Sequence, residues 1–338
     1  MTQSDTRRSV IAHIRRSRRP LLVSHSNPDP DSLGSVLGLA AVFKVLGAAP
    51  VVAVHKPETV DDVLGKIPGL SQIVPLNKNL LERPPDGRCF DAVFALDTAT
   101  PELLGVDDAT REALLAVRPV INIDHHVPRD ESYYTLSIVN IDAPSTTYMI
   151  WKYFEYLNLN TVPLEDNIAI PLYTGLLNDT GSFRYSAVDS DTHNMASHLL
   201  TSNVTPNEIF QHVYENRTIG KINLLSKMIE NLKFSENGKV GYAIIDKKIF
   251  NDSGASIEDT DGLADFIRSI KGVEVSFSIT SLDSTKISFR SRGEYTVNDI
   301  AQIFGGGGHY FAAGAEISES EIDQVVDKIL SELHGKIK

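Results

Sequence analysis

The first half of the chain alternates short apolar runs with longer amphipathic segments. The apolar runs have strand length and read PLLVSH (20–25), PVVAVH (50–55), FDAVFALDTA (90–99) and RPVINIDHH (118–126). Continuous apolarity over such a length is typical of strands buried on both faces, as in a parallel sheet covered by helices. The helices expected around them span 5–18, 31–47, 107–116, 145–157 and 164–177. This order predicts an α/β domain with a parallel sheet flanked by helices.

The pattern changes after about residue 187, where a helical stretch with little strand character begins. The segment KFSENGKVGYAIID (233–246) then predicts a hairpin about an Asn-Gly turn. VEVSFSIT (273–280) alternates as a half-buried strand does, and STKISFRSRG (284–293) supplies its neighbour. A last helix is expected at 320–334. We therefore predict a first domain over 1–187, a helical connector over 188–230, and a smaller α/β domain with a mixed sheet over 231–338.

Acidic and imidazole side chains stand at the ends of four predicted elements. They are His25, Asp29 and Asp31 in SHSNPDPDSLGS (24–35), then Asp97, then Asp124, His125 and His126, and finally Asp179 in GLLNDTGSFRYS (175–186). Each has an ordinary structural explanation: Asp31 could cap a helix that begins with Ser32, and Asp179 could simply end a helix. Together, however, they fall on one edge of the predicted sheet, where α/β proteins bind their ligands.

The chemistry of these side chains indicates a metal site. Carboxylates and imidazoles without a thiolate suit manganese, iron, zinc or cobalt. Asp29 and Asp31 are separated by Pro30, so their carboxylates can diverge toward different ions, and Asp97 can bridge the pair. Two ions about 3.5–4 Å apart are the usual arrangement for hydrolysis of a phosphoester.

Composition limits the partners and the compartment. The chain has 32 Lys and Arg against 44 Asp and Glu, a net charge of −12. A long nucleic-acid duplex needs a basic track, so it is not an expected partner, whereas a small anion held by metal ions is. The single Cys89 allows no disulfide within the chain, and no apolar stretch has the length of a membrane span. We therefore expect a cytoplasmic protein that does not act at a membrane.

Several of these motifs resemble those of a known family. NPDPDSLGS (27–35), ALDTA (95–99), NIDHHV (122–127) and GLLNDTGSFRYS look, in order and spacing, like the four motifs of the DHH phosphoesterase family. FGGGGHYFAAGA (304–315), with SFRSRG ahead of it, is similar to the DHH-associated C-terminal domain. Among members, the chain most resembles the nanoRNase and pAp-phosphatase group. The resemblance implies a DHH-type catalytic domain over 1–187, a substrate-binding domain over 231–338, and manganese-dependent hydrolysis of phosphoesters.

The resemblance also implies a role for each candidate residue. One ion would be held by His25, Asp29 and Asp97. The other would be held by Asp31, Asp97, His125 and Asp179. His126 would face the scissile phosphate, and Asp124 would orient a neighbouring imidazole. Pro30 stands where the family often has glycine, which stiffens this loop and puts its path in doubt.

A second set of candidates lies near the C-terminus. The glycines of the run, Gly305, Gly306, Gly307 and Gly308, would let backbone N–H groups approach an anion or a base closely, with His309 at its end. The alternative is a loose glycine loop. Arg290 and Arg292 are two apart on a strand, so they share a face. At least one is expected to reach a substrate phosphate.

The expected substrates are short RNA oligonucleotides or 3'-phosphoadenosine 5'-phosphate (pAp). A phosphodiesterase of cyclic or linear dinucleotides is the alternative within enzymes. A catalytically inactive nucleotide sensor is the alternative outside them, although such a protein would be expected to lack ligands and none is missing here. The sequence leaves open whether the protein forms a homodimer, which metal it uses and in which direction RNA would be degraded.

Overall fold

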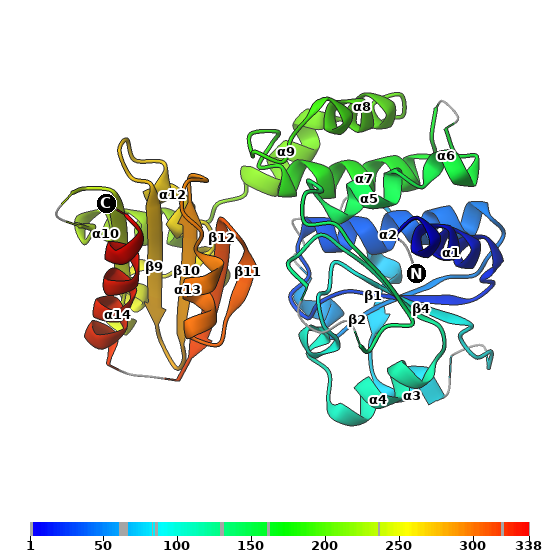
Figure 1. The fold of residues 1–338 in the computed structure, drawn as a ribbon, viewed down its shortest axis with the longest axis horizontal. Coiled ribbons are helices and arrows are strands. Elements are labelled where there is room, and N and C mark those ends of the chain that lie inside the picture. The colour runs from blue at the N-terminus through cyan, green and yellow to red at the C-terminus, as the bar shows by residue number, and fades with distance from the viewer. Residues whose placement is uncertain are drawn as a thin grey trace. The chain divides into compact units, whose positions relative to one another are not determined.

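The computed structural model describes residues 3–60, 67–82, 84, 87–128, 132–160, 163–235, 237–318 and 321–337. Residue 236 of the predicted hairpin and residue 320 of the predicted last helix lie outside this part. The chain divides into two compact units, Met1–Asn216 and Arg217–Lys338 (Figure 1). Much of the predicted connector over 188–230 therefore packs with the first unit, and its last part packs with the second.

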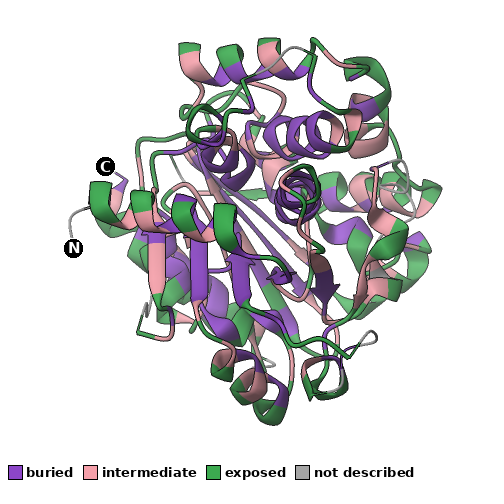
Figure 2. Ribbon diagram, turned by 90° about the vertical axis from the view of Figure 1, so that its right-hand side faces the viewer, coloured by how far each residue is buried: buried purple, intermediate pink, exposed green. Residues whose placement is uncertain are grey.

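The first unit is built on a six-stranded sheet in the order β3-β2-β1-β4-β5-β6. Every neighbouring pair in it is parallel. Its strands are β1 (Pro20–Val23), β2 (Val51–Val54), β3 (Val74–Pro75), β4 (Ala92–Leu96), β5 (Val120–Asp124) and β6 (Leu136–Val139). The central strands β1, β4 and β5 are buried along their whole length, as their continuous apolarity predicted (Figure 2).

Helices cover both faces of this sheet. One face packs against α1, α2 and α5, with α7 packed on α2, and the other face packs against α3 and α4 (Figure 1). The α-helices of the unit are α1 (Gln3–Arg16), α2 (Pro30–Val45), α3 (Lys78–Glu82), α4 (Asp108–Ala116), α5 (Thr146–Trp151), α6 (Phe154–Leu157), α7 (Asp166–Asp179), α8 (Ser190–Leu199) and α9 (Pro206–Tyr214). Short 3-10 turns lie at η1 (Pro57–Thr59), η3 (Leu70–Gln72) and η4 (Pro101–Leu104).

The helices α2 and α7 approach each other closely because α2 carries glycine on the shared face. A Cβ on Gly34 would lie 2.4 Å from the carbonyl oxygen of Pro171, and one on Gly38 would lie 2.6 Å from the side chain of Leu172. Both helices begin or end at candidate residues: α2 starts beside Asp29 and Asp31, and α7 ends on Asp179. Their contact therefore fixes the distance between these carboxylates.

The second unit contains a mixed sheet in the order β11-β12-β10-β9-β8-β7, in which β8 and β9 are parallel and the other pairs antiparallel. Its core packs α13 and α14 on one face and α10 and α12 on the other. The strands are β7 (Lys233–Phe234), β8 (Val240–Ile245), β9 (Val275–Ser281), β10 (Thr285–Ser291), β11 (Gly307–His309) and β12 (Ala312–Ile317). The helices are α10 (Ile219–Glu230), α11 (Lys247–Ser253), η5 (Glu258–Thr260), α12 (Leu263–Arg268), α13 (Asn298–Ile303) and α14 (Ile322–Lys336).

The predicted fold class is confirmed: a parallel sheet flanked by helices is followed by a smaller unit with a mixed sheet. The hairpin predicted about Asn237 and Gly238 is the antiparallel pair of β7 and β8. The single helix expected at 145–157 is instead two short helices, α5 and α6. Among the described helices, none combines the length and the apolar character that a membrane crossing requires.

Candidate metal centre

The candidate residues of the first unit meet at the carboxyl edge of its sheet. His25 follows β1, Asp97 follows β4, and Asp124 ends β5 directly before His125 and His126. Because β1, β4 and β5 are parallel neighbours, their ends lie side by side. Asp29 and Asp31 at the start of α2 and Asp179 at the end of α7 come to the same edge.

Besides the group of Asp97, Asp124 and His126, these side chains form two groups that could each hold a cation. In the first, ligand atoms of His25, Asp29 and Asp97 lie within 4.8 Å of one another. In the second, ligand atoms of Asp31, His125 and Asp179 do so. His125 Nε2 is 3.0 Å from Asp179 Oδ2 and 3.9 Å from Asp31 Oδ2.

Asp97 stands between the two groups. Its Oδ2 lies 3.8 Å from His25 Nε2, and its Oδ1 lies 3.5 Å from His125 Nε2. Its backbone is in the left-handed region (φ 56°), which Asp tolerates better than most residues and which often marks functional sites. One carboxylate oxygen therefore faces each group, the geometry that a bridging ligand requires.

Asp29, and not Asp31, caps α2. The helix begins at Pro30, and Asp29 Oδ1 accepts the backbone N–H of Ser32 at 2.9 Å. The interpretation of Asp31 as the cap is therefore wrong, because the helix begins at the proline, two residues before Ser32. Asp31 lies inside the first turn, fully buried.

The histidines are oriented through their Nδ1 atoms. His125 Nδ1 is 3.1 Å from the carbonyl oxygen of Ala143, so in the neutral ring Nδ1 donates and Nε2 is the acceptor that faces the carboxylates. His126 Nδ1 is 2.8 Å from Asp124 Oδ1, which also accepts the backbone N–H of His126 at 3.0 Å. Asp124 thus orients His126 within the described structure.

The electrostatics of the cluster are those of crowded carboxylates. Burial, followed by the charges of Asp179 and Asp97, raises the pKa of Asp29 to about 6 and the pKa of Asp31 well above its usual value. Burial opposes ionisation of Asp97 as well, but its neighbouring imidazoles, His126 above all, hold its pKa below the usual range. Although burial alone would lower it, the hydrogen bond with Asp179 raises the pKa of His125 to about 10.

The cluster therefore fits divalent cations. Asp97 Oδ2 and Asp124 Oδ2 are buried and have no hydrogen-bond partner within the described part of the chain. Buried carboxylates whose mutual repulsion raises their pKa are stabilised by a cation placed among them. Carboxylate oxygens and imidazole nitrogens suit Mn, Fe, Zn and Co.

Sequence reasoning missed two threonines that contact the cluster and the serine that precedes them. Ser145, Thr146 and Thr147 stand at the start of α5, and both threonines hydrogen-bond the candidate ligands Asp31 and Asp97. These contacts join residues that are 49 and 116 positions apart in the sequence. The only signal in the sequence is a Ser-Thr-Thr run, which predicts no more than the start of a helix.

In the second unit, both candidate arginines already have partners. Arg290 Nε donates to Asp265 Oδ2 at 2.8 Å. Arg292, which follows the end of β10, donates to the carbonyl oxygens of Arg268 and Ile270, each at 2.9 Å. Arg292 therefore caps the carboxyl end of α12, while Arg290 makes a partly exposed ion pair.

The glycine run is part of the sheet rather than a loose loop. Gly307–His309 form the edge strand β11, which pairs with β12. A Cβ on Gly306 would lie 2.1 Å from the carbonyl oxygen of Gly314, and one on Gly308 would lie 2.6 Å from that of Ala312. The glycines therefore permit close pairing of the two strands, with Gly305 in the left-handed region (φ 75°) at the turn before them.

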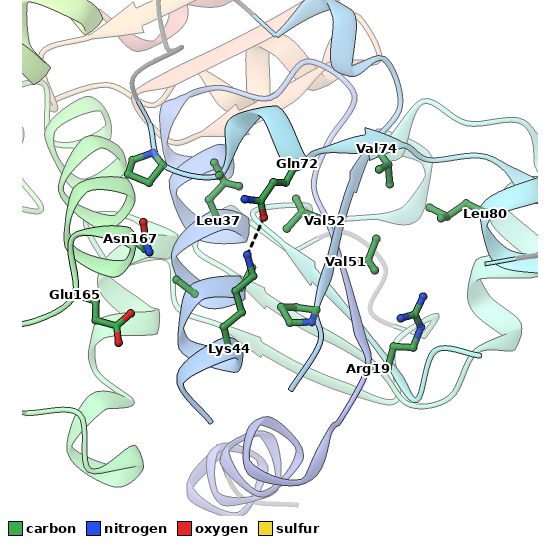
Figure 3. A pocket seen from close by; sticks show the side chains of 15 residues that line it. Arg19, Leu37, Lys44, Val51, Val52, Gln72, Val74, Leu80, Glu165 and Asn167 are labelled. Atoms are coloured by element: carbon green, nitrogen blue, oxygen red, sulfur yellow. Dashed lines mark hydrogen bonds between the residues drawn. The ribbon is translucent and has the colours of Figure 1, made fainter. Parts of the chain in front are cut away.

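A cavity of about 390 Å³ lies elsewhere in the first unit (Figure 3). Val51 and Val52 at the start of β2 line it, together with Arg19, which precedes β1. Lys44 donates to Gln72 at 2.8 Å across its mouth. Because the strands are parallel, this cavity belongs to the amino edge of the sheet, and the candidate ligands belong to the carboxyl edge.

Comparison with known proteins agrees with this architecture. A protein from Thermus thermophilus named "Bifunctional oligoribonuclease and PAP phosphatase NrnA" is 28% identical over 318 residues, covering 94% of this chain and 89% of that protein. "Cyclic-di-AMP phosphodiesterase GdpP" from Geobacillus thermodenitrificans is 26% identical over 345 residues, covering 97% of this chain but 50% of that protein. The crystal structure of an exopolyphosphatase-related protein from Bacteroides fragilis has the same fold, with a TM-score of 0.85 at 23% identity over 97% of this chain and 96% of that one.

The matches to domain families follow the two units. Residues 20–176 match the DHH family, N-terminal domain, which covers the sheet of the first unit. Residues 237–335 match the DHHA1 domain, which covers strands β8 to β12 of the mixed sheet in the second unit. The chain therefore belongs to the DHH family and carries a DHHA1 domain in its second unit.

Proposed function

We propose that the protein is a two-metal phosphoesterase that hydrolyses short oligoribonucleotides and pAp. The observation that carries this proposal is the pair of ligand groups on either side of Asp97, each with a carboxylate and an imidazole. The relative from Thermus thermophilus, whose name describes both activities and which matches over most of both chains, supports the choice of substrates.

We assign His25, Asp29 and Asp97 to one cation, and Asp31, Asp97, His125 and Asp179 to the other. Two divalent cations bound here would supply Lewis-acid activation of the phosphoester and would lower the pKa of a water molecule. We propose Mn²⁺ because the donor set combines hard carboxylates with imidazoles.

His126 is the residue proposed to meet the scissile phosphate. Its side chain is 30% exposed, whereas Asp124 behind it is buried. Asp124 accepts from Nδ1 and so orients the ring, and we propose that Nε2 holds a proton toward a phosphoryl oxygen. Although burial alone would lower it, the charge of Asp97 and the hydrogen bond with Asp124 raise the pKa of His126 well above its usual value, which favours the protonated ring that an anionic substrate needs.

The second unit is proposed to recognise the nucleotide. We expect contacts from His309, from the glycine run and from Arg290, whose exposed pairing with Asp265 is more readily exchanged for a phosphate than the carbonyl contacts of Arg292. We also predict that the protein is cytoplasmic and that it can form a homodimer.

A panel of substrates tests the proposal. The purified protein is incubated with Mn²⁺ and pAp, RNAs of two to 24 nucleotides, cyclic and linear dinucleotides, or pyrophosphate. We expect fastest turnover of the shortest RNAs and of pAp. Faster turnover of a cyclic dinucleotide would favour the second candidate function, which the Geobacillus relative suggests. No turnover of any of them by a metal-loaded protein would favour a nucleotide sensor.

A matched variant tests the division of labour. His309→Ala removes a proposed nucleotide contact from the second unit and leaves every proposed ligand in place. We expect KM for nucleotides to rise while the metal content stays at the wild-type level. Loss of metal in this variant would contradict the assignment of all ligands to the first unit.

A further inference from the structure

The start of α5 is connected to the metal centre by a directed chain of hydrogen bonds. An ionised Asp31 can only accept, so Thr147 Oγ1 donates to its Oδ1 at 2.7 Å. The Thr147 hydroxyl can then accept from Ser145 Oγ at 2.7 Å, and Ser145 Oγ accepts the backbone N–H of Tyr148 at 3.0 Å. Every donor in this chain thus has a defined acceptor.

Two backbone N–H groups also donate hydrogen bonds to Asp31. The N–H of Thr146 lies 2.7 Å from Oδ2, and the N–H of Thr147 lies 3.1 Å from Oδ1. Oδ1 therefore accepts two hydrogen bonds and Oδ2 accepts one. The remaining lone pair is on Oδ2, the oxygen nearer His125. The carboxylate is oriented before any cation arrives.

Thr146 makes a second, separate contact. Its hydroxyl donates to Asp97 Oδ1 at 3.0 Å, and both side chains are buried. This bond fixes the rotation of the Asp97 carboxylate, so Oδ1 is held toward His125 and Oδ2 toward His25. Thr147 holds a ligand of one group, whereas Thr146 holds the ligand shared by both.

The Thr147 side chain packs closely against two neighbouring helices. A Cβ on Gly175 would lie 2.7 Å from Asp31 Oδ1 and 2.6 Å from the methyl group of Thr147. The same methyl group would lie 3.2 Å from a Cβ on Gly34. The Thr147 methyl group therefore lies close to both α2 and α7, which restricts rotation of the side chain.

We propose that Thr146 and Thr147 are positioning residues that set the loading of the two metal positions separately. Thr147 acts on the position that Asp31 holds. Thr146 acts on both positions through Asp97. This inference rests on the proposed function only in assuming that the two groups bind cations.

Paired variants separate the hydroxyl from the rest of the side chain. Thr147→Val keeps the shape and removes the hydroxyl, and Thr147→Ser keeps the hydroxyl and removes the methyl group; the same pair is made at Thr146. Contacts to residues that hold ligands typically contribute 10- to 100-fold in metal affinity. The readout is calorimetric titration of the metal-free full chain with Mn²⁺, which requires no turnover.

We expect Thr147→Val to weaken one of two Mn²⁺ sites by about 10-fold or more, and Thr146→Val to weaken both. The serine variants should recover most of the affinity. In an Asp31→Asn background, where only the His25 position remains, Thr146→Val should still weaken binding and Thr147→Val should not. Equal effects of both valine variants in that background, or no effect of either in the wild type, would overturn the inference.

A substitute variant and the binding behaviour of the wild type complete the test. If Thr147→Val does not fold, Ser145→Ala removes the hydroxyl that donates to Thr147 and should weaken the same single site. An unchanged affinity in that variant would count against the inference. A wild-type chain that binds no Mn²⁺ would overturn the proposed function itself, whereas a chain that binds two ions with unaltered valine variants would overturn only the inference.

Discussion

Asp29 has two roles that a single substitution can separate. It caps α2 through Oδ1, and it crowds the other carboxylates of the metal centre. Asn caps a helix as well as Asp does. Asp29→Asn therefore keeps the cap, removes the charge and removes one proposed ligand.

The structure gives the size and sign of the effect. Burial and the neighbouring carboxylates raise the pKa of Asp29 to about 6, from 3.8. A carboxyl group whose pKa is higher in the folded state destabilises the fold above that pKa, and this cost disappears as the pH falls toward the unfolded value. A shift of this size corresponds to a destabilisation of the folded state by about 3 kcal/mol above pH 6. Because solvent screens charges at this partly exposed position, we expect a destabilisation in the range of roughly 1–3 kcal/mol. The metal-free Asp29→Asn protein should thus be more stable than the wild type at pH 7.5 and equally stable near pH 4.

The assay uses the single tryptophan of the chain, Trp151, which lies on α5 in the first unit. Its fluorescence follows urea unfolding of that unit in the presence of a chelator, at pH 7.5 and pH 4. Asp107→Asn is the matched control, because Asp107 caps α4 in the same way at a fully exposed position. This control should not gain stability. A metal-free Asp29→Asn protein that is less stable than the wild type at pH 7.5 would refute the reasoning.

Three other predictions follow from the same geometry. Because the pKa of His125 is raised to about 10 and that of Asp29 to about 6, protons compete with cations for the metal-free centre. Mn²⁺ affinity measured by calorimetry should therefore rise from pH 6 to pH 8, and a pH-independent affinity would contradict this. Turnover of two- to five-nucleotide RNAs should exceed that of a 24-mer and should depend only weakly on salt. The reason is that a chain with 44 acidic and 32 basic residues offers few contacts to phosphates. Faster turnover of the 24-mer, with a steep salt dependence, would contradict this and indicate a basic track. Arg292→Ala should lower the calorimetric unfolding temperature of the second unit, because it removes the cap of α12. Arg290→Ala should instead raise KM, with a smaller effect on the unfolding temperature. A lower unfolding temperature in Arg290→Ala and a higher KM in Arg292→Ala would contradict these roles.

The fold and the positions of the candidate ligands could be predicted because both depend on local pattern. Buried parallel strands read as continuous apolar runs, and the polar residue that ends such a run lies at the carboxyl edge of the sheet. This reasoning placed His25, Asp97 and Asp124 on one edge, where the structure has them. The edge strand β6 was not predicted because its sequence, LSIV, is short and only partly buried.

Contacts between distant segments could not be predicted in this way. The helix begins at Pro30 rather than at Ser32, so Asp29 is the cap and Asp31 accepts hydrogen bonds from Thr146 and Thr147. Nothing in the Ser-Thr-Thr run indicates which carboxylate it contacts. Likewise, the glycine run predicts backbone freedom, but only the sheet shows that Gly306 and Gly308 permit the pairing of β11 with β12.

The central claim is that two cations share Asp97. Electron paramagnetic resonance of the protein titrated with Mn²⁺ tests it most directly, because two manganese ions joined by one carboxylate give a spin-coupled signal and isolated ions do not. The account predicts two ions per wild-type chain with a coupled signal, and loss of the coupling with weakened binding of both ions in Asp97→Asn. A wild-type chain that binds a single ion, or an Asp97→Asn chain that keeps two coupled ions, would contradict it.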